Sequence, residues 1–250
     1  SMMLKRFLLI AILIPGLVAT VWAQEAVNEG WETVVKLNDL IVEMKKTAGS
    51  NVHTFRCSGY MKASVAAIEN CIRDLEAMKK IAFRFDTADI LNEPTLGLVS
   101  SKDMLYVYGK LDAPWPVEDR DCVAAFKYLI DPKTGVLTCE MLPQQTDYRL
   151  DKTGKERIRV TVAYGKYTLI PKGEDLTYAM AEGLGDPGGL VPPSVVNLFA
   201  RYGFVYSFKK FRILATSEKY DNPSAKMITT TAMSCPPPSI NISKVLTPPQ

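Results

Sequence analysis

Apolar and polar positions alternate along a series of strand-length segments in the middle of the chain. These segments are 83–91, 104–111, 122–130, 136–142, 158–170 and 176–183. In 158–170, apolar side chains occupy the even positions from 158 to 164, while Arg157 and Arg159 lie among the odd ones, giving one apolar and one mixed face. Asp, Pro and Gly in the short connection 131–135 favour a tight turn. The pattern predicts an antiparallel meander in which sequence neighbours are sheet neighbours.

The region before the meander allows two interpretations. Residues 31–47 carry apolar side chains at positions that a helix could place on one face, but Asn38 and Asp39 interrupt them. Because Asn and Asp favour turns, we expect two short strands joined at this pair, with a helix as the alternative. Residues 54–60 predict a further strand.

Two helices and a tail complete the pattern. Ser64 is a predicted N-cap, and the apolar residues that follow it recur at helical spacing as far as Met78. A second, longer helix should begin at Pro193 and continue to about Leu214, with aromatic residues on more than one face. Residues 218–250 lose this periodicity and are rich in proline, which predicts a flexible tail.

The N-terminus has the pattern of an export signal. Lys5 and Arg6 precede an apolar run over 7–22 that ends in small residues, which predicts a signal peptide over residues 1–23. The run is shorter than a bilayer requires, although a retained anchor is the alternative. We therefore expect an exported protein, either periplasmic in a bacterium or secreted.

Charge and cysteine usage narrow the chemistry. The 250 residues include 30 basic and 27 acidic side chains, and removal of Lys5 and Arg6 would leave a formal charge of about +1. Such a balance argues against a nucleic-acid surface. The five cysteines show no C-x-x-C spacing, and His53 is the one histidine, so we expect neither a metal site nor a redox motif. The residues predict a single domain over 31–217, and no cofactor.

Two motifs stand out in the sequence: residues 113–121 read APWPVEDRD, and residues 186–192 read DPGGLVP, with Asn197 following. They resemble the START domain family of lipid-transfer proteins, in which the corresponding stretches are aPWPvkdRDfv and DPGG-x-x-P and an Asn often follows. The resemblance covers roughly residues 31–216. It implies an α+β helix-grip fold (START/Bet v 1-like), in which a strongly curved antiparallel sheet wraps a long C-terminal helix around a cavity for one lipid.

The resemblance also places candidate ligand contacts. In the family, the loop of Trp115 lies near the cavity mouth, although a structural tryptophan at a sheet end is an equal alternative. Arg120 and Arg84 could orient a polar lipid head through their guanidinium groups, or form ion pairs that hold a loop.

Further candidates come from the last helix and the last strand. Phe199, Tyr202 and Tyr206 follow helical spacing and would place rings against the sheet, as cavity lining or as ordinary core. Tyr178 and Met180 share one face of a strand and could form an adaptable wall.

Three functions remain open at this stage. The leading hypothesis is non-catalytic binding and transfer of a sterol, hopanoid or phospholipid by a monomer that touches membrane surfaces transiently. The second is a cyclase- or hydrolase-like helix-grip enzyme, for which Asp86, Asp89 and Arg84 are the candidate polar groups. The third is a periplasmic interaction module that uses the Pro-rich tail.

Overall fold

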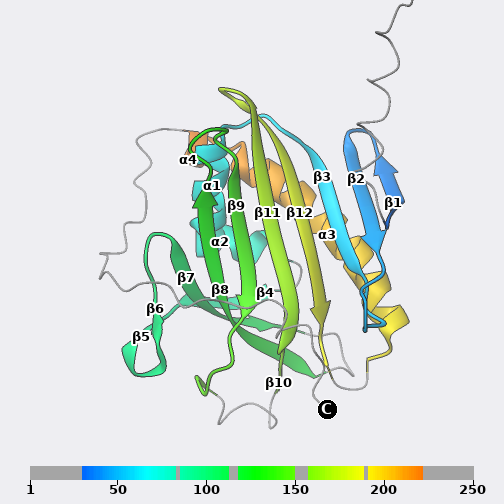
Figure 1. Cartoon of the computed structure of the whole chain (residues 1–250), viewed down its shortest axis with the longest axis vertical. Coiled ribbons are helices and arrows are strands. Elements are labelled where there is room, and N and C mark those ends of the chain that lie inside the picture. Colours follow the sequence, from blue (N-terminus) through cyan, green and yellow to red (C-terminus); the bar gives the residue numbers. More distant parts are fainter. Residues whose placement is uncertain (1–29, 83–84, 113–117, 150–156, 189–190, 222–250) are drawn as a thin grey trace, which may run out of the picture. The chain divides into compact units, whose positions relative to one another are not determined.

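The computed structural model describes residues 30–82, 85–112, 118–149, 157–188 and 191–221. The chain divides into two compact units, Ser1–Trp31 and Glu32–Gln250, and the fold below belongs to the second, apart from the first residue of β1. The elements in chain order (Figure 1) are β1 (Trp31–Leu37), β2 (Leu40–Lys45), β3 (Thr54–Met61), α1 (Val65–Arg73), α2 (Leu75–Ile81), β4 (Phe85–Ile90), β5 (Asn92–Glu93), the 3-10 turn η1 (Pro94–Leu96), β6 (Leu98–Val99), β7 (Met104–Leu111), β8 (Asp119–Ile130), β9 (Leu137–Pro143), β10 (Arg157–Arg159), β11 (Val162–Gly173), β12 (Leu176–Asp186), α3 (Pro193–Ala215) and α4 (Glu218–Asp221).

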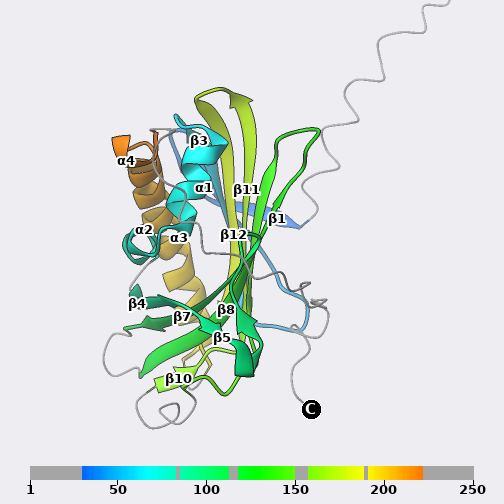
Figure 2. The same ribbon diagram turned by 90° about the vertical axis from the view of Figure 1, so that its left-hand side faces the viewer.

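One large sheet dominates the fold. Its strand order is β1-β2-β3-β12-β11-β9-β8-β7-β4, with β10 paired to β8 and β5–β6 forming a separate small hairpin. The helices lie on one side of this sheet, and β4 and β7 curve towards that side (Figure 2). The sheet is therefore concave towards α3, as the helix-grip prediction requires.

The predicted meander is confirmed in its order. The strands β4, β7, β8, β9, β11 and β12 pair antiparallel with their sequence neighbours. The two-strand interpretation of residues 31–47 is also confirmed: β1 and β2 flank a turn in which Asn38 adopts a φ of 50°, a left-handed conformation that Asn tolerates.

Two predicted elements need correction, and the structure adds one element that the sequence did not predict. The helix after Ser64 is interrupted at Asp74, whose side chain accepts hydrogen bonds from the backbone N–H groups of Glu76 and Ala77 and so starts α2. The strand expected over 158–170 is two strands, because β10 leaves the meander to pair parallel with β8. The hairpin β5–β6 was not predicted.

The domain also extends beyond the boundary expected at residue 217. Helix α4 follows it, and Tyr220 is 7 % exposed and donates a 2.6 Å hydrogen bond to Asp74 Oδ2. The rest of the predicted tail, 222–250, and the predicted signal peptide over 1–23 lie outside the described residues.

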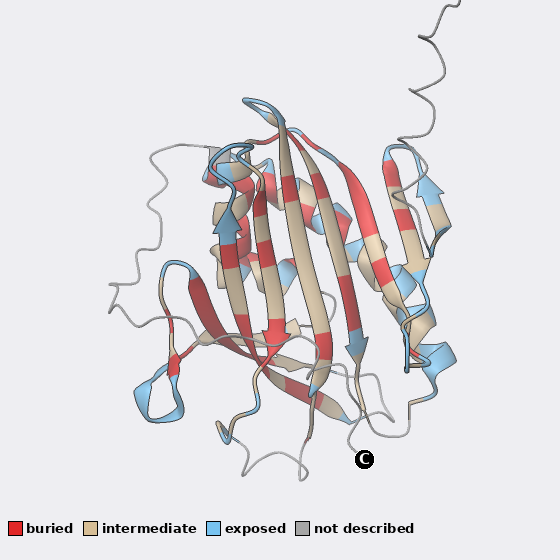
Figure 3. Cartoon of the chain, in the orientation of Figure 1, coloured by how far each residue is buried: buried red, intermediate tan, exposed pale blue. Residues whose placement is uncertain are grey.

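The buried residues form two clusters, one on each face of the sheet (Figure 3). The main core fills the space between the concave face and the helices, while a smaller cluster around Tyr108 lies on the outer face of β7 and β8.

Burial raises the pKa of the Cys57, Cys71 and Cys139 thiols to about 12 and that of Cys122 to about 11. Cys57, Cys71 and Cys139 belong to the main core, whereas Cys122 is half-buried, and a raised pKa makes all four thiols poor nucleophiles at neutral pH. Within the described ranges, no helix combines the length and hydrophobicity needed to cross a bilayer.

Candidate functional site

Helix α3 lies across the concave face and packs against β2, β3 and β12. Its sheet-facing rings sit over glycines: a Cβ at Gly183 would lie 3.2 Å from Phe204 Cζ, and one at Gly59 would lie 3.4 Å from Phe208 Cε1. Phe208 and Phe211 are 2 % and 1 % exposed. The C-terminal half of α3 is therefore fixed by close apolar packing over strands that carry no side chain at the contact.

The predicted wall of Tyr178 and Met180 is on the other face of the sheet. Ala179 and Ala181, at the alternate positions of β12, belong to the core beneath α3. Since successive strand residues point to opposite faces, Tyr178 and Met180 point away from α3. Tyr178 instead forms an edge-to-face pair with Tyr60 of β3, which is 47 % exposed. The face was misassigned because both faces of β12 carry apolar residues.

The predicted aromatic stripe of α3 does not pack against the sheet. Phe199, Tyr202 and Tyr206 are 48 %, 66 % and 42 % exposed, and the rings that meet the sheet are Phe204 and Phe208. The expected position was wrong because this helix is aromatic on more than one face, so spacing alone could not select the buried one. Contact with a ligand stays a prediction for these three residues.

The N-terminal half of α3 is held largely by polar contacts. Asn197 Oδ1 accepts a 2.8 Å hydrogen bond from the His53 backbone N–H, and Asn197 Nδ2 donates a 3.1 Å bond to the Asn51 carbonyl. Arg201 donates to the Val34 carbonyl. Asn197 follows the second family motif in the sequence. In the structure, its two hydrogen bonds connect α3 to the loop between β2 and β3.

Arg120 links the two sequence motifs. Its guanidinium donates to the carbonyls of Pro187 at 3.2 Å and Gly188 at 3.1 Å, and to that of Glu118, and the residue is 5 % exposed. The expected ion pair with its neighbours is wrong, because Asp119 pairs with Lys110 at 3.2 Å and Asp121 pairs with other arginines. Arg120 thus holds the loop before α3 against the start of β8, and its contact with a ligand stays a prediction.

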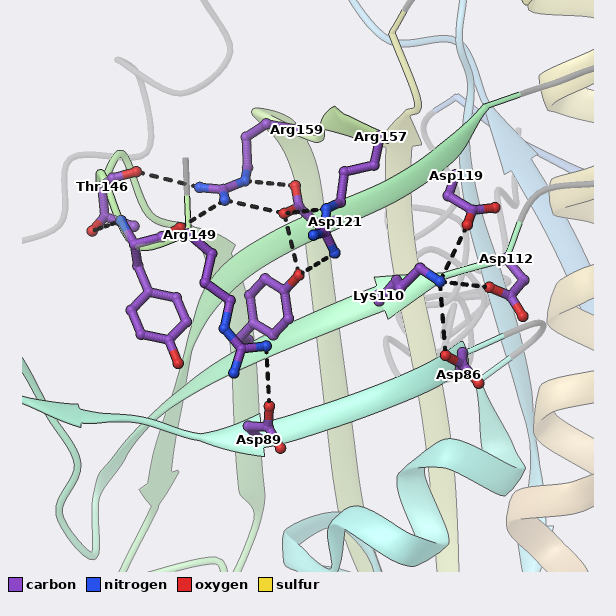
Figure 4. Close-up of polar contacts among 12 residues, drawn as sticks. Asp86, Asp89, Lys110, Asp112, Asp119, Asp121, Thr146, Arg149, Arg157 and Arg159 are labelled. Carbon is purple, nitrogen blue, oxygen red and sulfur yellow. Dashed lines mark hydrogen bonds and ion pairs between the residues drawn. The ribbon is translucent and has the colours of Figure 1, made fainter. Parts of the chain in front are cut away.

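A buried charge network on the outer face was missed by the sequence analysis (Figure 4). Asp121 is 0 % exposed and accepts from Arg159 Nε at 2.7 Å and Nη2 at 3.2 Å, while Arg157 Nε lies 3.7 Å from Oδ2. Tyr108 donates to the same oxygen at 3.4 Å and accepts from Arg157 Nη1 at 2.8 Å. Burial, and then the Asp121 carboxylate, raise the pKa of Tyr108. The network fastens β10 to β8.

The carboxylates considered for catalysis are engaged in ion pairs at the surface. Asp86 Oδ2 lies 4.0 Å from Lys110 Nζ, which also pairs with Asp112 at 3.3 Å, and Asp89 lies 3.6 Å from Arg149 (Figure 4). Their side chains are 49 % and 46 % exposed. Arg84, the third candidate for catalysis, and Trp115 lie outside the described residues.

A pocket of about 310 Å³ opens beside α3, on the side turned towards α2 and β4. We call it the lysine pocket; its walls include Lys79, Lys80, Phe85, Tyr206, Lys210 and Ile213. Of the predicted ligand residues that the structure describes, Tyr206 is the one that reaches it. A second pocket, about 550 Å³, has a polar wall that includes Gln144, Gln145 and Arg159.

Comparisons with known proteins place this architecture. No protein-family model matches the chain. A Pseudomonas aeruginosa protein, PA1579, which is itself uncharacterised, is 27 % identical over 178 residues, covering 71 % of this chain and 82 % of that one. A crystal structure of a STAR-related lipid transfer protein from Xanthomonas axonopodis superposes with a TM-score of 0.64 at 23 % identity, covering 75 % of this chain and 99 % of that chain. The chain has the helix-grip fold of START domains.

Human START proteins give the same result. Human STARD10 superposes with a TM-score of 0.63 at 17 % identity, covering 77 % of this chain and 74 % of that chain. Human StAR-related lipid transfer protein 5 gives 0.61 at 12 % identity, covering 74 % and 86 %. The predicted helix-grip fold is confirmed.

Proposed function

We propose that this START-like chain binds one hydrophobic lipid, a sterol, hopanoid or phospholipid, between its sheet and α3, and carries it without chemical change. The observation that carries the proposal is the grip of α3 on a concave sheet, shared with structures described as lipid transfer proteins. Each methylene removed from water contributes about 0.8 kcal/mol, so an acyl chain or a ring system supplies enough free energy for binding without a charged anchor.

Exchange of the lipid would proceed through the N-terminal half of α3. That half exposes Phe199 and Tyr202 and is tied down by Asn197 and Arg201, whereas Phe208 fixes the other half. Polar contacts near the surface exchange with water at low cost, while the buried rings do not. We therefore propose that the first half of α3 moves away from the sheet at a membrane surface and that the second half stays in place.

The proposed setting is an aqueous compartment outside the cytoplasm, the bacterial periplasm or the exterior, in keeping with the export signal expected from Lys5, Arg6 and the apolar run that follows. There a monomer would pick up lipid from one membrane and release it at another.

The test is native mass spectrometry, with organic extraction, of the protein purified from its own source. A stoichiometric lipid that survives purification supports the proposal and identifies the lipid class. A mass equal to that of the bare chain, together with no uptake from liposomes, would refute it.

A separate substitution tests the proposed route of lipid exchange through the N-terminal half of α3. Asn197→Ala removes both ties to the loop between β2 and β3, and should raise the rate of lipid transfer between vesicles several-fold with the amount bound unchanged. Ser194→Ala, in the exposed first turn of α3, is the matched control and should transfer at the wild-type rate. Equal rates for all three proteins would contradict an opening at this end of α3.

A further inference from the structure

The lysine pocket lies between α3, the end of α2 and the start of β4, away from the strands β2, β3 and β12 on which α3 packs. Phe85, the first residue of β4, and Ile213 of α3 supply apolar walls, and Ile213 is 66 % exposed. Lysines line it from two elements: Lys79 and Lys80 at the end of α2, and Lys210 on α3. An apolar wall beside clustered ammonium groups fits a ligand that is itself half apolar and half anionic.

The described acidic side chains near the pocket pair with Lys79 and Lys110. Glu76 forms an ion pair with Lys79 at 2.5 Å, and Asp86 lies beside Lys110 and accepts a 3.0 Å hydrogen bond from Thr87. Among the residues that the structure describes, neither Lys80 nor Lys210 forms an ion pair. Within this part of the chain, the positive charges of Lys80 and Lys210 therefore lack a neutralising carboxylate.

Helix electrostatics explain only part of this arrangement. Lys79 and Lys80 stand in the last turn of α2, where the helix dipole favours cations. Lys210 stands before the last turn of α3, the turn that contains Arg212, and its Nζ is 5.8 Å from the centre of the Tyr206 ring. The helix dipole falls off within the last turn, so it favours Lys210 less than it favours Lys79 and Lys80. The contact with the Tyr206 ring leaves the ammonium N–H groups of Lys210 available to an acceptor.

We propose that the lysine pocket binds the phosphate headgroup of an anionic phospholipid, with Lys80 and Lys210 as the phosphate contacts and Phe85 and Ile213 against the first methylenes of the chains. This second site rests on the proposed lipid binding and deepens it, because it makes the carrier prefer anionic over zwitterionic lipids. The preference acts at a pocket distinct from the contact of α3 with β2, β3 and β12.

The experiment compares short-chain phosphatidylglycerol, short-chain phosphatidylcholine and glycerol phosphate, all below micelle formation, by titration monitored with native mass spectrometry. The full chain is used as wild type, as Lys80→Gln/Lys210→Gln, and as the matched control Lys46→Gln/Lys172→Gln, which removes the same charge from exposed positions elsewhere. Circular dichroism verifies that all three proteins are folded.

We expect the wild type and the control to prefer phosphatidylglycerol, and the pocket variant to bind it about three- to tenfold more weakly with phosphatidylcholine unchanged. An equal loss in both double variants would overturn the pocket, since net charge alone would then set the preference. Glycerol phosphate binding as tightly as the lipid would also overturn it, because the site would then be one for free phosphate esters. If the wild type binds neither lipid, the proposed lipid binding itself fails, which is a result distinct from lipid binding without preference.

Discussion

Substitution of Asp121 by Asn tests whether the buried network holds the outer face of the sheet together. Asn keeps the size of the side chain but removes the negative charge that faces Arg157 and Arg159. Removing one partner of a buried ion pair typically costs about 3–5 kcal/mol, because the other charge stays buried without compensation. Arg159 keeps backbone acceptors at Thr146 and Tyr148, so the lower end, about 3 kcal/mol, is expected here.

A loss of this size is large for a domain whose total stability is about 5–15 kcal/mol. Urea unfolding followed by circular dichroism measures it directly. With a slope of about 2 kcal/mol per molar urea, the midpoint for Asp121→Asn should fall by roughly 1.5 M with the slope unchanged.

Asp89→Asn is the matched control. It makes the same chemical change at a carboxylate that is 46 % exposed and lies 3.6 Å from Arg149, where an ion pair is worth about 0–1 kcal/mol. Its midpoint should fall by less than about 0.5 M. If the two variants unfold at the same urea concentration, the network does not stabilise the sheet and the reasoning from burial is refuted.

Three further outcomes are expected. Gly59→Ala should lower stability by about 1–3 kcal/mol in thermal unfolding, because its Cβ would lie 2.9 Å from the Asp39 carbonyl oxygen. Gly185→Ala, with no atom within 4 Å, should change stability by less than about 0.5 kcal/mol, and a reversed order would contradict the close packing. The three core cysteines, Cys57, Cys71 and Cys139, whose pKa values burial raises to about 12, should stay protonated at pH 8 and react slowly with a thiol reagent until denaturant is added. Fast labelling of three or more of the five thiols in the native chain would contradict their burial. A chain ending at Ser217 should be less stable than one ending at Asp221 by about 2 kcal/mol in urea, because it loses the buried Tyr220 ring, and equal midpoints would show that α4 contributes nothing.

Local chemistry made most of the fold predictable. The turn at Asn38, the N-cap at Ser64 and the proline that starts α3 at Pro193 each act over a few residues, and the structure has all of them. The split at Asp74 follows the same physics, since an Asp side chain can cap a new helix, but six apolar residues at helical spacing outweighed that single residue in the sequence pattern.

The site was harder to predict because it depends on which face each element buries. Alternation in β12 separates Tyr178 from Ala179 but does not say which of them meets α3, and an apolar surface on both sides removes the usual contrast. Arg157 and Arg159 looked like the polar side of a strand, yet their partner Asp121 lies in a distant segment of the chain. A pair of arginines two residues apart is compatible with a solvated face and with a buried network alike.

The pairing of β3 with β12 has a consequence for how the chain folds. Phe55 is opposite Gly183 and Met61 is opposite Thr177, so β3 joins the rest of the sheet through β12. The first strands can therefore pair with the meander only after the last strand has been synthesised. While the chain is being synthesised, β1, β2 and β3 can pair only with one another, and the central pairing of β3 with β12 closes late over a long loop. This topology delays formation of the complete sheet until nearly all of the domain has been synthesised. The last strand, β12, is the segment that must be present before the central pairing can form.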